Sequence, residues 1–231
     1  ETSRKFFPKG KIVLTGNPVR QMANGTHSAN SGQEWQMAND EKFPLIYVTG
    51  GSSGSHFINA LVENNLTKIL EKFNVIHQTG ESFKYNDFSR LGKIKASLPK
   101  KLQGRYILTK FIDPSLVGSI LEKADIVISR SGINTVTELI FFGVPSLLIP
   151  LPFSQRQEQL KNALFLKTKG CAEIFEQKDD SAKQNIFLSK LFDIFENINK
   201  YRENLQKISK LVNTDAARKI IDVLEYAKKK K

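Results

Sequence analysis

The stretch Ala124-Asp-Ile-Val-Ile-Ser-Arg-Ser-Gly-Ile-Asn-Thr-Val-Thr-Glu138 decides the fold of this chain. Its first half is an apolar, β-branched run, which is typical of a buried strand, and the Ser-Gly pair that follows indicates a tight turn. From Ile133 to Phe142 the apolar residues return at helical spacing. The stretch therefore predicts a strand, a turn and a helix that begins at the carboxyl end of the strand.

The start of this helix has the chemistry of an anion site. The first N–H groups of a helix lack acceptors within the helix, and the helix dipole adds a partial positive charge there, so phosphate binds well. Glu138, one to two turns further on, can accept hydrogen bonds from the two hydroxyl groups of a ribose. The pattern favours a nucleotide site, although an ordinary turn followed by a solvated glutamate has the same appearance.

Strands and helices alternate along most of the chain. We predict strands at residues 11–15, 45–49, 75–78, 105–109, 126–129, 146–149 and 172–175, and helices at 57–73, 111–121, 133–142, 158–169, 184–197 and 200–226. This alternation predicts an α/β fold, a parallel sheet with helices on both faces. Ligands of such sheets bind beyond the carboxyl ends of the strands. The loops expected at that edge are residues 50–55, 111–114, 129–133 and 150–155.

Composition limits the class of protein. The net charge of +12 favours anionic partners, but the basic residues are scattered and do not alternate with aromatic residues, so we predict no nucleic-acid binding. Cys171 is the only cysteine, which excludes a disulfide framework and a thiolate metal site. No His, Cys or carboxylate cluster has metal-ligand spacing, and no apolar stretch approaches the ~20 residues of a membrane span. A cytosolic location is the expectation that follows.

Several loops carry side chains suited to a phosphorylated sugar. The glycines of Gly50–Gly54 allow close backbone approach to a phosphate, and Ser52 can donate its hydroxyl, although the loop is neither a G-x-G-x-x-G nor a Walker motif. Arg20 could supply a cation. Gln159 and Asn162 share one helical face, and amides suit sugar hydroxyl groups. A surface role is the simpler interpretation of Arg20, and the glycine loop and the two amides are equally compatible with a plain turn and a polar helix start.

The histidines are predicted to be non-catalytic. His56 lies on the first turn of a helix with no carboxylate partner nearby in the sequence, so we expect it to be solvated. His77 follows an apolar run at a strand end, where a structural histidine is more common than a ligand.

Taken in order, the motifs resemble the MurG glycosyltransferases of family 28. The motifs are Gly16-Asn-Pro-Val-Arg20, Gly50-Gly-Ser-Ser-Gly54, His77-Gln-Thr-Gly80, Phe111-Ile-Asp113, Ala124-Asp-Ile-Val-Ile-Ser-Arg-Ser-Gly132, Thr135-x-x-Glu138, Gly143-Val-Pro145 and Gln159-x-x-Asn162-Ala163. The agreement runs from about Lys11 to the end, except over residues 23–42. This chain departs from the usual family pattern at Ser53, where Gln is common, at His56, where Arg is common, and at Asn134, in a variable position.

The resemblance implies one half of a GT-B fold, in which two Rossmann-like domains face each other across a cleft. It divides the chain into residues 1–22, the last strand of the acceptor domain and the hinge; residues 23–42, a polar linker; and residues 43–231, the nucleotide-sugar-binding domain with its C-terminal helices. The acceptor-binding domain would then be a partner, in the same polypeptide or as a separate subunit.

The resemblance also assigns roles to residues. Ile112 would present its backbone to uracil, and Glu138 would hold the ribose. Ser52 and the turn from Ile133 to Thr135 would contact the diphosphate, Gln159 and Asn162 the sugar, and Arg20 the phosphates from the hinge. The implied UDP-N-acetylglucosamine site comprises Arg20, Ser52, Ile112, Ile133, Asn134, Thr135, Val136, Thr137, Glu138, Gln159 and Asn162. It needs no metal or other cofactor, and the catalytic base belongs to the other half.

The function implied is transfer of N-acetylglucosamine, with inversion, to lipid I (undecaprenyl-pyrophosphoryl-MurNAc-pentapeptide), which forms lipid II for peptidoglycan. This chain alone would be inactive. It would reside in the cytoplasm, peripheral to the membrane, with weak affinity for anionic lipid. Two alternatives remain open: a non-catalytic nucleotide-sugar-binding subunit of a split glycosyltransferase, and a relative of UDP-N-acetylglucosamine 2-epimerases, which would need carboxylates and a histidine for proton transfer.

Overall fold

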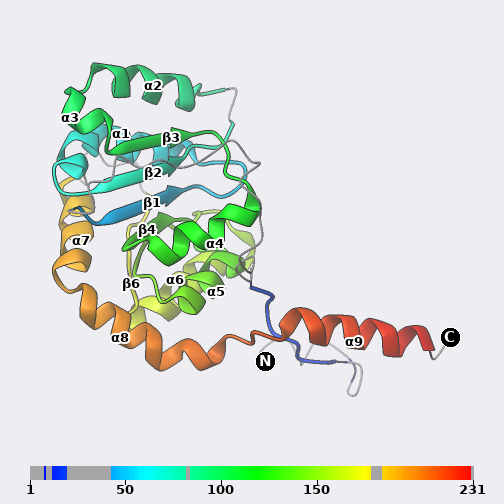
Figure 1. Ribbon diagram of the computed structural model, residues 1–231. Helices are drawn as coiled ribbons and strands as arrows, with labels where there is room; N and C mark the ends of the chain where they lie inside the picture. The colour runs from blue at the N-terminus through cyan, green and yellow to red at the C-terminus, as the bar shows by residue number, and fades with distance from the viewer. Residues whose placement is uncertain (1–7, 9–11, 20–42, 82–83, 178–183, 230–231) are drawn as a thin grey trace.

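One six-stranded parallel sheet organises the molecule (Figure 1). The computed structural model describes residue 8 and residues 12–19, 43–81, 84–177 and 184–229. The strand order is β3-β2-β1-β4-β5-β6. The strands are β1 (Leu45–Thr49), β2 (Asn74–Gln78), β3 (Tyr106–Thr109), β4 (Ile126–Ser129), β5 (Ser146–Leu148) and β6 (Ala172–Ile174). All five pairings are parallel, which confirms the predicted α/β fold.

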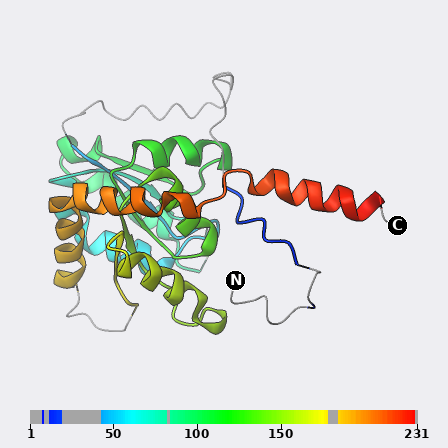
Figure 2. The same ribbon diagram turned by 90° about the horizontal axis from the view of Figure 1, so that it is seen from below.

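Helices connect the strands and cover both faces of the sheet (Figures 1 and 2). They are α1 (His56–Leu70), α2 (Asp87–Ser97), α3 (Lys100–Gln103), α4 (Pro114–Lys123), α5 (Ile133–Phe142), α6 (Glu158–Thr168), α7 (Gln184–Glu196), α8 (Ile198–Ile208) and α9 (Ala216–Lys229), with 3₁₀ turns η2 (Gln155–Gln157) and η4 (Ser209–Leu211). Within the described residues, no helix combines the length and the apolar character that crossing a membrane requires.

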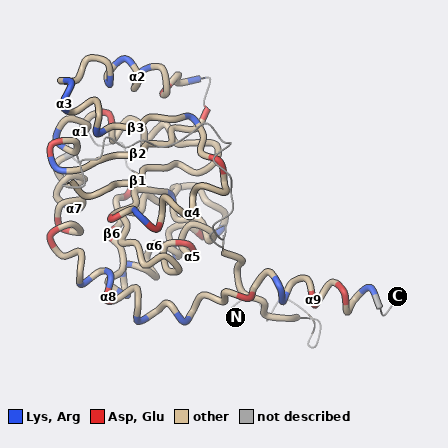
Figure 3. The backbone as a smooth tube through the Cα atoms, in the orientation of Figure 1, with Lys and Arg blue, Asp and Glu red and all other residues tan. Residues whose placement is uncertain are grey.

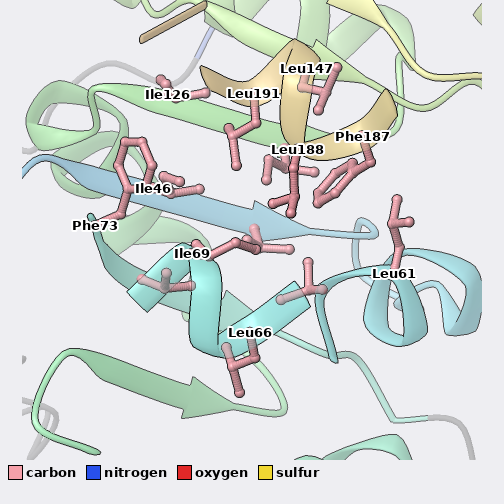
Figure 4. Close-up of a cluster of buried hydrophobic side chains, with 14 of the residues drawn as sticks. Ile46, Leu61, Leu66, Ile69, Phe73, Ile126, Leu147, Phe187, Leu188 and Leu191 are labelled. Atoms are coloured by element: carbon pink, nitrogen blue, oxygen red, sulfur yellow. The ribbon is translucent and has the colours of Figure 1, made fainter. Parts of the chain in front are cut away.

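Two hydrophobic layers sandwich the sheet. Alternate residues of β1 face opposite layers: Ile46 and Val48 pack with α1 and α7, whereas Leu45 and Tyr47 pack with α4, α5 and α6. Figure 4 shows the first layer, with Ile46 between side chains of α1 and α7. A central strand buried on both faces reads as a continuous apolar run, which is why β1 and β4 were predictable from the sequence.

The strand order reverses between β1 and β4. β1 pairs with β2 on one side and with β4 on the other, and the chain builds outward in both directions from this pair. The loops that leave the carboxyl ends of these two strands diverge and leave a crevice, which is where open α/β sheets bind ligands.

The predictions were wrong in three places. Residues 12–15 form no strand, because a strand requires a hydrogen-bonded neighbour, and Val13 and Leu14 are each 59% exposed. The single helix predicted over 200–226 is broken between α8 and α9, where the Asn213 side chain accepts a hydrogen bond from Asp215 N (3.1 Å) and competes with helical bonding. Helices α2 and α3 were missed because α2 buries little apolar surface, Leu91 above all.

Helix α9 stands away from the sheet and its layers (Figures 1 and 2). Its apolar residues Ile221 and Leu224 are 54% and 64% exposed. The segment 12–19 lies beside its start, where Asn213 Nδ2 donates to the carbonyl of Thr15 at 2.6 Å. The predicted linker, residues 23–42, lies outside the described residues.

Candidate functional site

Two adjoining cavities open at the carboxyl edge of the sheet, where the strand order reverses. The smaller cavity, about 270 Å³, lies over α4 and α5, and the larger cavity, about 770 Å³, lies between the starts of α1 and α5. Four residues line both: Gly51, Ser52, Asn134 and Thr135. The two cavities therefore form one continuous site with a shared wall.

The glycine-rich loop after β1 supplies one side of this wall. Gly54 has a φ of +74°, and a Cβ there would overlap the carbonyl oxygen of Thr79, so the loop is pressed against the end of β2. Ser55 caps α1 by accepting from Ile58 N at 3.4 Å. Ser52 is exposed at the loop tip and lines both cavities, as expected for a phosphate contact.

The start of α5 supplies the opposite side. Gly132 is the N-cap and gives no side-chain hydrogen bond, while the N–H of Val136 already bonds to the Gly132 carbonyl. The N–H groups of Ile133, Asn134 and Thr135 precede this first helical bond and have no acceptor within the helix. All three residues line the larger cavity, so the cavity has the donors and the dipole that favour an anion.

Arg130 adds a half-buried positive charge to the larger cavity. Its guanidinium donates to Ser55 Oγ (2.7 Å), to Gln177 Oε1 (2.9 Å) and to the carbonyls of Ile149 (3.0 Å) and Pro150 (3.4 Å). All four acceptors are neutral, and no ion pair to Arg130 occurs among the described residues. Burial lowers the pKa of Arg130 to about 10, which still leaves it charged near neutral pH. The cavity therefore carries a cation that an anionic ligand can neutralise.

The smaller cavity is lined by both residues that were predicted to contact the nucleoside, Glu138 and Ile112. Glu138 lies on its wall, one turn after Asn134 on the same helix. Ile112 lines it too, although the residue as a whole is 1% exposed and its side chain belongs to the core. Phe111, 52% exposed, covers the same wall.

Gln159 and Asn162 were predicted to face the sugar. In this structure both amides form hydrogen bonds that hold neighbouring loops in place. Gln159 lines the larger cavity, and its Oε1 accepts from Leu151 N at 3.0 Å. Asn162 Nδ2 donates to the carbonyl of Ser131 at 3.0 Å, and Ser131 Oγ donates back to the Gln159 carbonyl at 2.8 Å. Asn162 is not on the wall of either cavity, so it supports the loop after β4 in this state.

Two other predicted residues, Val136 and Thr137, do not line the cavities, and Arg20 lies outside the described residues. The side chain of Val136 is 4% exposed and packs in the core. Thr137 Oγ1 donates to the Ile133 carbonyl (2.7 Å) and accepts from Asn17 (3.2 Å), so it stabilises the first turn of α5 from behind.

A histidine–carboxylate pair that no sequence pattern indicated lies at the larger cavity. His56 lines this cavity, and its Nδ1 is 2.8 Å from Oδ1 of Asp87. His56 is partly exposed, as expected, but it has a carboxylate partner that is distant in the sequence. Asp87 follows His56 by 31 residues and begins a helix that the apolar pattern did not reveal, so no local signal joins them. Arg130 was part of the motif Ala124–Gly132 but was given no role in the site. Its position in the loop after a strand, next to the Ser-Gly pair, was the signal that could have identified it.

His77, near the end of β2, is structural, as predicted. His77 is fully buried, and burial lowers its pKa to about 3, so the ring is neutral. Asn59 Nδ2 donates to Thr79 O and to Asp87 Oδ2, which directs its Oδ1 at His77 Nε2 (3.0 Å). The Nε2 atom therefore carries the proton, and Nδ1 accepts from the Tyr106 hydroxyl at 2.8 Å.

The positions of the potential metal ligands and of the basic residues limit which other ligands the described part of the chain can bind. No group of three or more His, Cys, Asp or Glu side chains suited to a metal ion occurs in the part of the chain that the structure describes. Lys and Arg are spread over several helices, α2, α8 and α9 among them, and form no single stripe in this view (Figure 3).

Comparison with known proteins finds relatives over most of the chain. Curated relatives include the UDP-N-acetylglucosamine--N-acetylmuramyl-(pentapeptide) pyrophosphoryl-undecaprenol N-acetylglucosamine transferases of Oenococcus oeni, 31% identical over 220 residues, and Clostridium tetani, 33% identical over 222 residues. The matches cover 94% and 96% of this chain but 56% of each relative. The chain thus spans about half the length of the curated relatives it matches.

Solved structures support the fold. The crystal structure of Acinetobacter baumannii MurG matches with a TM-score of 0.64 at 24% identity, over 82% of this chain and 52% of that one. The model of the glycosyltransferase family 28 C-terminal domain matches residues 45–224, which include every strand and both cavities. The chain therefore belongs to the family of glycosyltransferase family 28 C-terminal domains.

Proposed function

We propose that this chain binds UDP-N-acetylglucosamine and is the donor-binding half of an inverting transferase that adds GlcNAc to lipid I. The observation that carries this proposal is the continuous site, in which a pocket bearing Glu138 joins a cationic cavity through Ser52, Asn134 and Thr135. A uridine in the smaller cavity would place its diphosphate against the start of α5. The sugar would then lie in the larger cavity, near Gln159. The named relatives from Oenococcus oeni and Clostridium tetani support this choice of donor and acceptor.

In the proposed reaction, the acceptor hydroxyl oxygen forms a bond to C1 of the sugar while the bond from C1 to the β-phosphate oxygen breaks. The electron pair leaves on UDP, and the hydroxyl proton passes to a base in the acceptor-binding half. Negative charge grows on the diphosphate, where the N–H groups of α5 and the guanidinium of Arg130 stabilise it. Because these groups supply the positive charge, we expect no obligatory metal.

The acceptor-binding half is the required partner, in the same polypeptide or as a separate subunit, and the lipid-linked acceptor is reached through it. The exposed apolar residues of α9, Ile221 and Leu224, together with Val13 and Leu14 beside its start, provide a surface for that half. We place the assembled enzyme at the cytoplasmic face of the membrane, with the +12 charge of this chain adding weak attraction to anionic lipid.

The family match over residues 45–224 favours the transferase over a relative of the epimerases. Whether the chain is one half of a single polypeptide or a subunit is decided by the reading frame that precedes it.

The test is calorimetric titration of the folded chain with UDP, UDP-N-acetylglucosamine and ADP. We expect the two uridine ligands to bind with similar affinity and ADP to bind more weakly. Transfer to lipid I should appear only after addition of an acceptor-binding half. Absence of heat with both uridine ligands, on protein with a native circular dichroism spectrum, would refute the donor site.

A further inference from the structure

The larger cavity holds a second basic group in addition to Arg130. His56, the first residue of α1, lies on its wall with a side chain that is 38% exposed. Nδ1 is held by Asp87, whose side chain is 2% exposed, at 2.8 Å. Tyr85 stacks on the ring, with centroids 3.8 Å apart and an angle of 7° between the planes. Among the described residues, no hydrogen bond engages Nε2, so Nε2 is the ring nitrogen that remains for a ligand.

Asp87 is built to stay ionised. Burial alone would raise its pKa, but hydrogen bonds from Asn59, His56 and Arg90 outweigh burial, so the pKa lies below its usual value. Arg90 is itself paired with Glu63 at 2.7 Å. An ionised Asp87 accepts the proton on Nδ1 of His56, which leaves Nε2 as the ring nitrogen that can meet a ligand.

The charged groups around the ring determine what the protonated form would attract. On α2, Asp87 favours the protonated ring and Arg90 disfavours it. In the segment before α2, the Nζ atom of Lys84 lies 5.2 Å from the centroid of the Tyr85 ring, which stacks on His56. From the loop after β4, Arg130 reaches Ser55, the neighbour of His56. Asp87 and Glu63 together balance a protonated His56 and Arg90, so the positive charge that remains on the cavity wall is that of Arg130, near the N–H groups at the start of α5. An anionic ligand is attracted to that charge.

We propose that protonated His56 donates a hydrogen bond from Nε2 to the diphosphate of the sugar nucleotide, and that Asp87 is the residue that positions it. This inference rests on the proposed function and adds a contact to the same site. Where the resembling family commonly has an arginine, this chain has an imidazole, which donates from both ring nitrogens only in its protonated form, whereas a guanidinium is always a donor. Donor affinity should therefore fall as the pH rises, which a guanidinium would not cause.

Titration of UDP-N-acetylglucosamine by calorimetry across about pH 5 to about pH 8 tests this inference. The sugar nucleotide is the correct probe because its diphosphate is a diester and keeps its charge, whereas the terminal phosphate of UDP titrates in the same range. We expect the affinity of the native chain to fall about tenfold over this range, as one charge-assisted hydrogen bond is lost.

Three variants distinguish a contact made by His56 from the effect of another nearby cation. His56→Gln should bind weakly at every pH, and His56→Arg should bind tightly at every pH, both without the native pH dependence. Lys84→Gln, which removes a nearby cation that is not on the cavity wall, should keep the native profile. A native profile in His56→Gln, or a flat profile in the native chain, would overturn the inference and leave the proposed function standing. No binding by the folded native chain at any pH would instead overturn the proposed function.

A spectroscopic readout covers the case in which His56→Gln does not fold. In the ¹⁵N-labelled native chain, the Nε2 resonance that His56→Arg removes should move on addition of UDP-N-acetylglucosamine, and its titration midpoint should rise. An unchanged resonance and midpoint in the saturated complex would overturn the inference.

Discussion

The side-chain amide of Asn17 donates a hydrogen bond to Oδ1 of Asn134 at 3.1 Å, across 117 residues of sequence. The same amide donates to Oγ1 of Thr137 at 3.2 Å. Asn134 lines both cavities, and Thr137 is bonded to the carbonyl of Ile133, so the segment 12–19 braces the turn proposed to bind the diphosphate. A segment outside the sheet thus helps to preset the site.

Asn17→Ala should weaken UDP binding about fivefold without unfolding the chain, because the first turn of α5 loses two neutral hydrogen bonds that order it. Calorimetric titration with UDP checks this. Asn197→Ala, which removes an exposed asparagine at the start of α8, is the matched control and should bind normally. Equal affinity of the two variants would show that the brace has no role in binding.

Glu138→Ala should weaken UDP binding by ~2 kcal/mol or more, because charge-assisted hydrogen bonds to two ribose hydroxyl groups are lost. Glu138→Gln should lose less, since the amide retains an acceptor. The decisive comparison uses 2′-deoxy-UDP: its penalty relative to UDP should be large for the native chain and small for Glu138→Ala. If the two penalties are the same, Glu138 does not bind the ribose.

Recognition of uracil should depend on the backbone at Ile112 and not on its buried side chain. Ile112→Val should therefore keep the preference for UDP-N-acetylglucosamine over ADP-N-acetylglucosamine, although it reduces stability by about 1 kcal/mol through the lost methyl group. Competition titrations measure the preference, and urea unfolding measures the stability. Equal affinity of the native chain for the two sugar nucleotides would contradict the assignment.

Acid should destabilise the fold through His77. In the unfolded chain this histidine binds a proton below its ordinary pKa of 6.5, whereas burial lowers its pKa in the folded chain to about 3. Between these values the unfolded state binds more protons, so stability falls as pH falls, approaching about 1.4 kcal/mol per pH unit for this one group. Urea unfolding at pH values down to about 5 measures the slope. His77→Gln should show a shallower slope, and an unchanged slope would exclude His77 as the cause.

Association with membranes should be weak and electrostatic. The +12 charge favours anionic headgroups by roughly 1 kcal/mol for each basic residue near the surface, but scattered residues cannot all reach a bilayer together. Sedimentation with anionic vesicles should therefore be partial and reversed by salt, with none on neutral vesicles. Tight binding that resists salt would point instead to insertion of an apolar element, for which the exposed face of α9 is the place to look.

The sheet and most of the site were predictable because their signals are local. β1 and β4 are buried on both faces and appear as continuous apolar runs. The glycines and serines of the two loops follow directly after these strands in the sequence, so the loops could be recognised from local sequence. The parallel connections then place these loops on one edge, which brings Ser52 and Asn134 to the same wall.

The remainder depends on contacts that sequence patterns do not encode. His56 and Asp87 meet across 31 residues, and Asn17 reaches Asn134 across 117, so neither pair has a periodicity. The prediction that residues 12–15 form a strand relied on apolar content alone, which cannot supply a hydrogen-bonded neighbour. The break before α9 arises from a side chain, that of Asn213, that satisfies a backbone N–H locally.

The reversal of strand order between β1 and β4 has a consequence for folding. Arg130 after β4 reaches Ser55 after β1 across 75 residues, so the two walls exist together only once the central strand pair has formed. A ligand that bridges the walls binds the folded state alone and adds RT ln(1 + [L]/Kd) to its stability. That gain should appear as slower amide hydrogen exchange at the centre of the sheet, in β1 and β4, while α9 continues to exchange at its ligand-free rate.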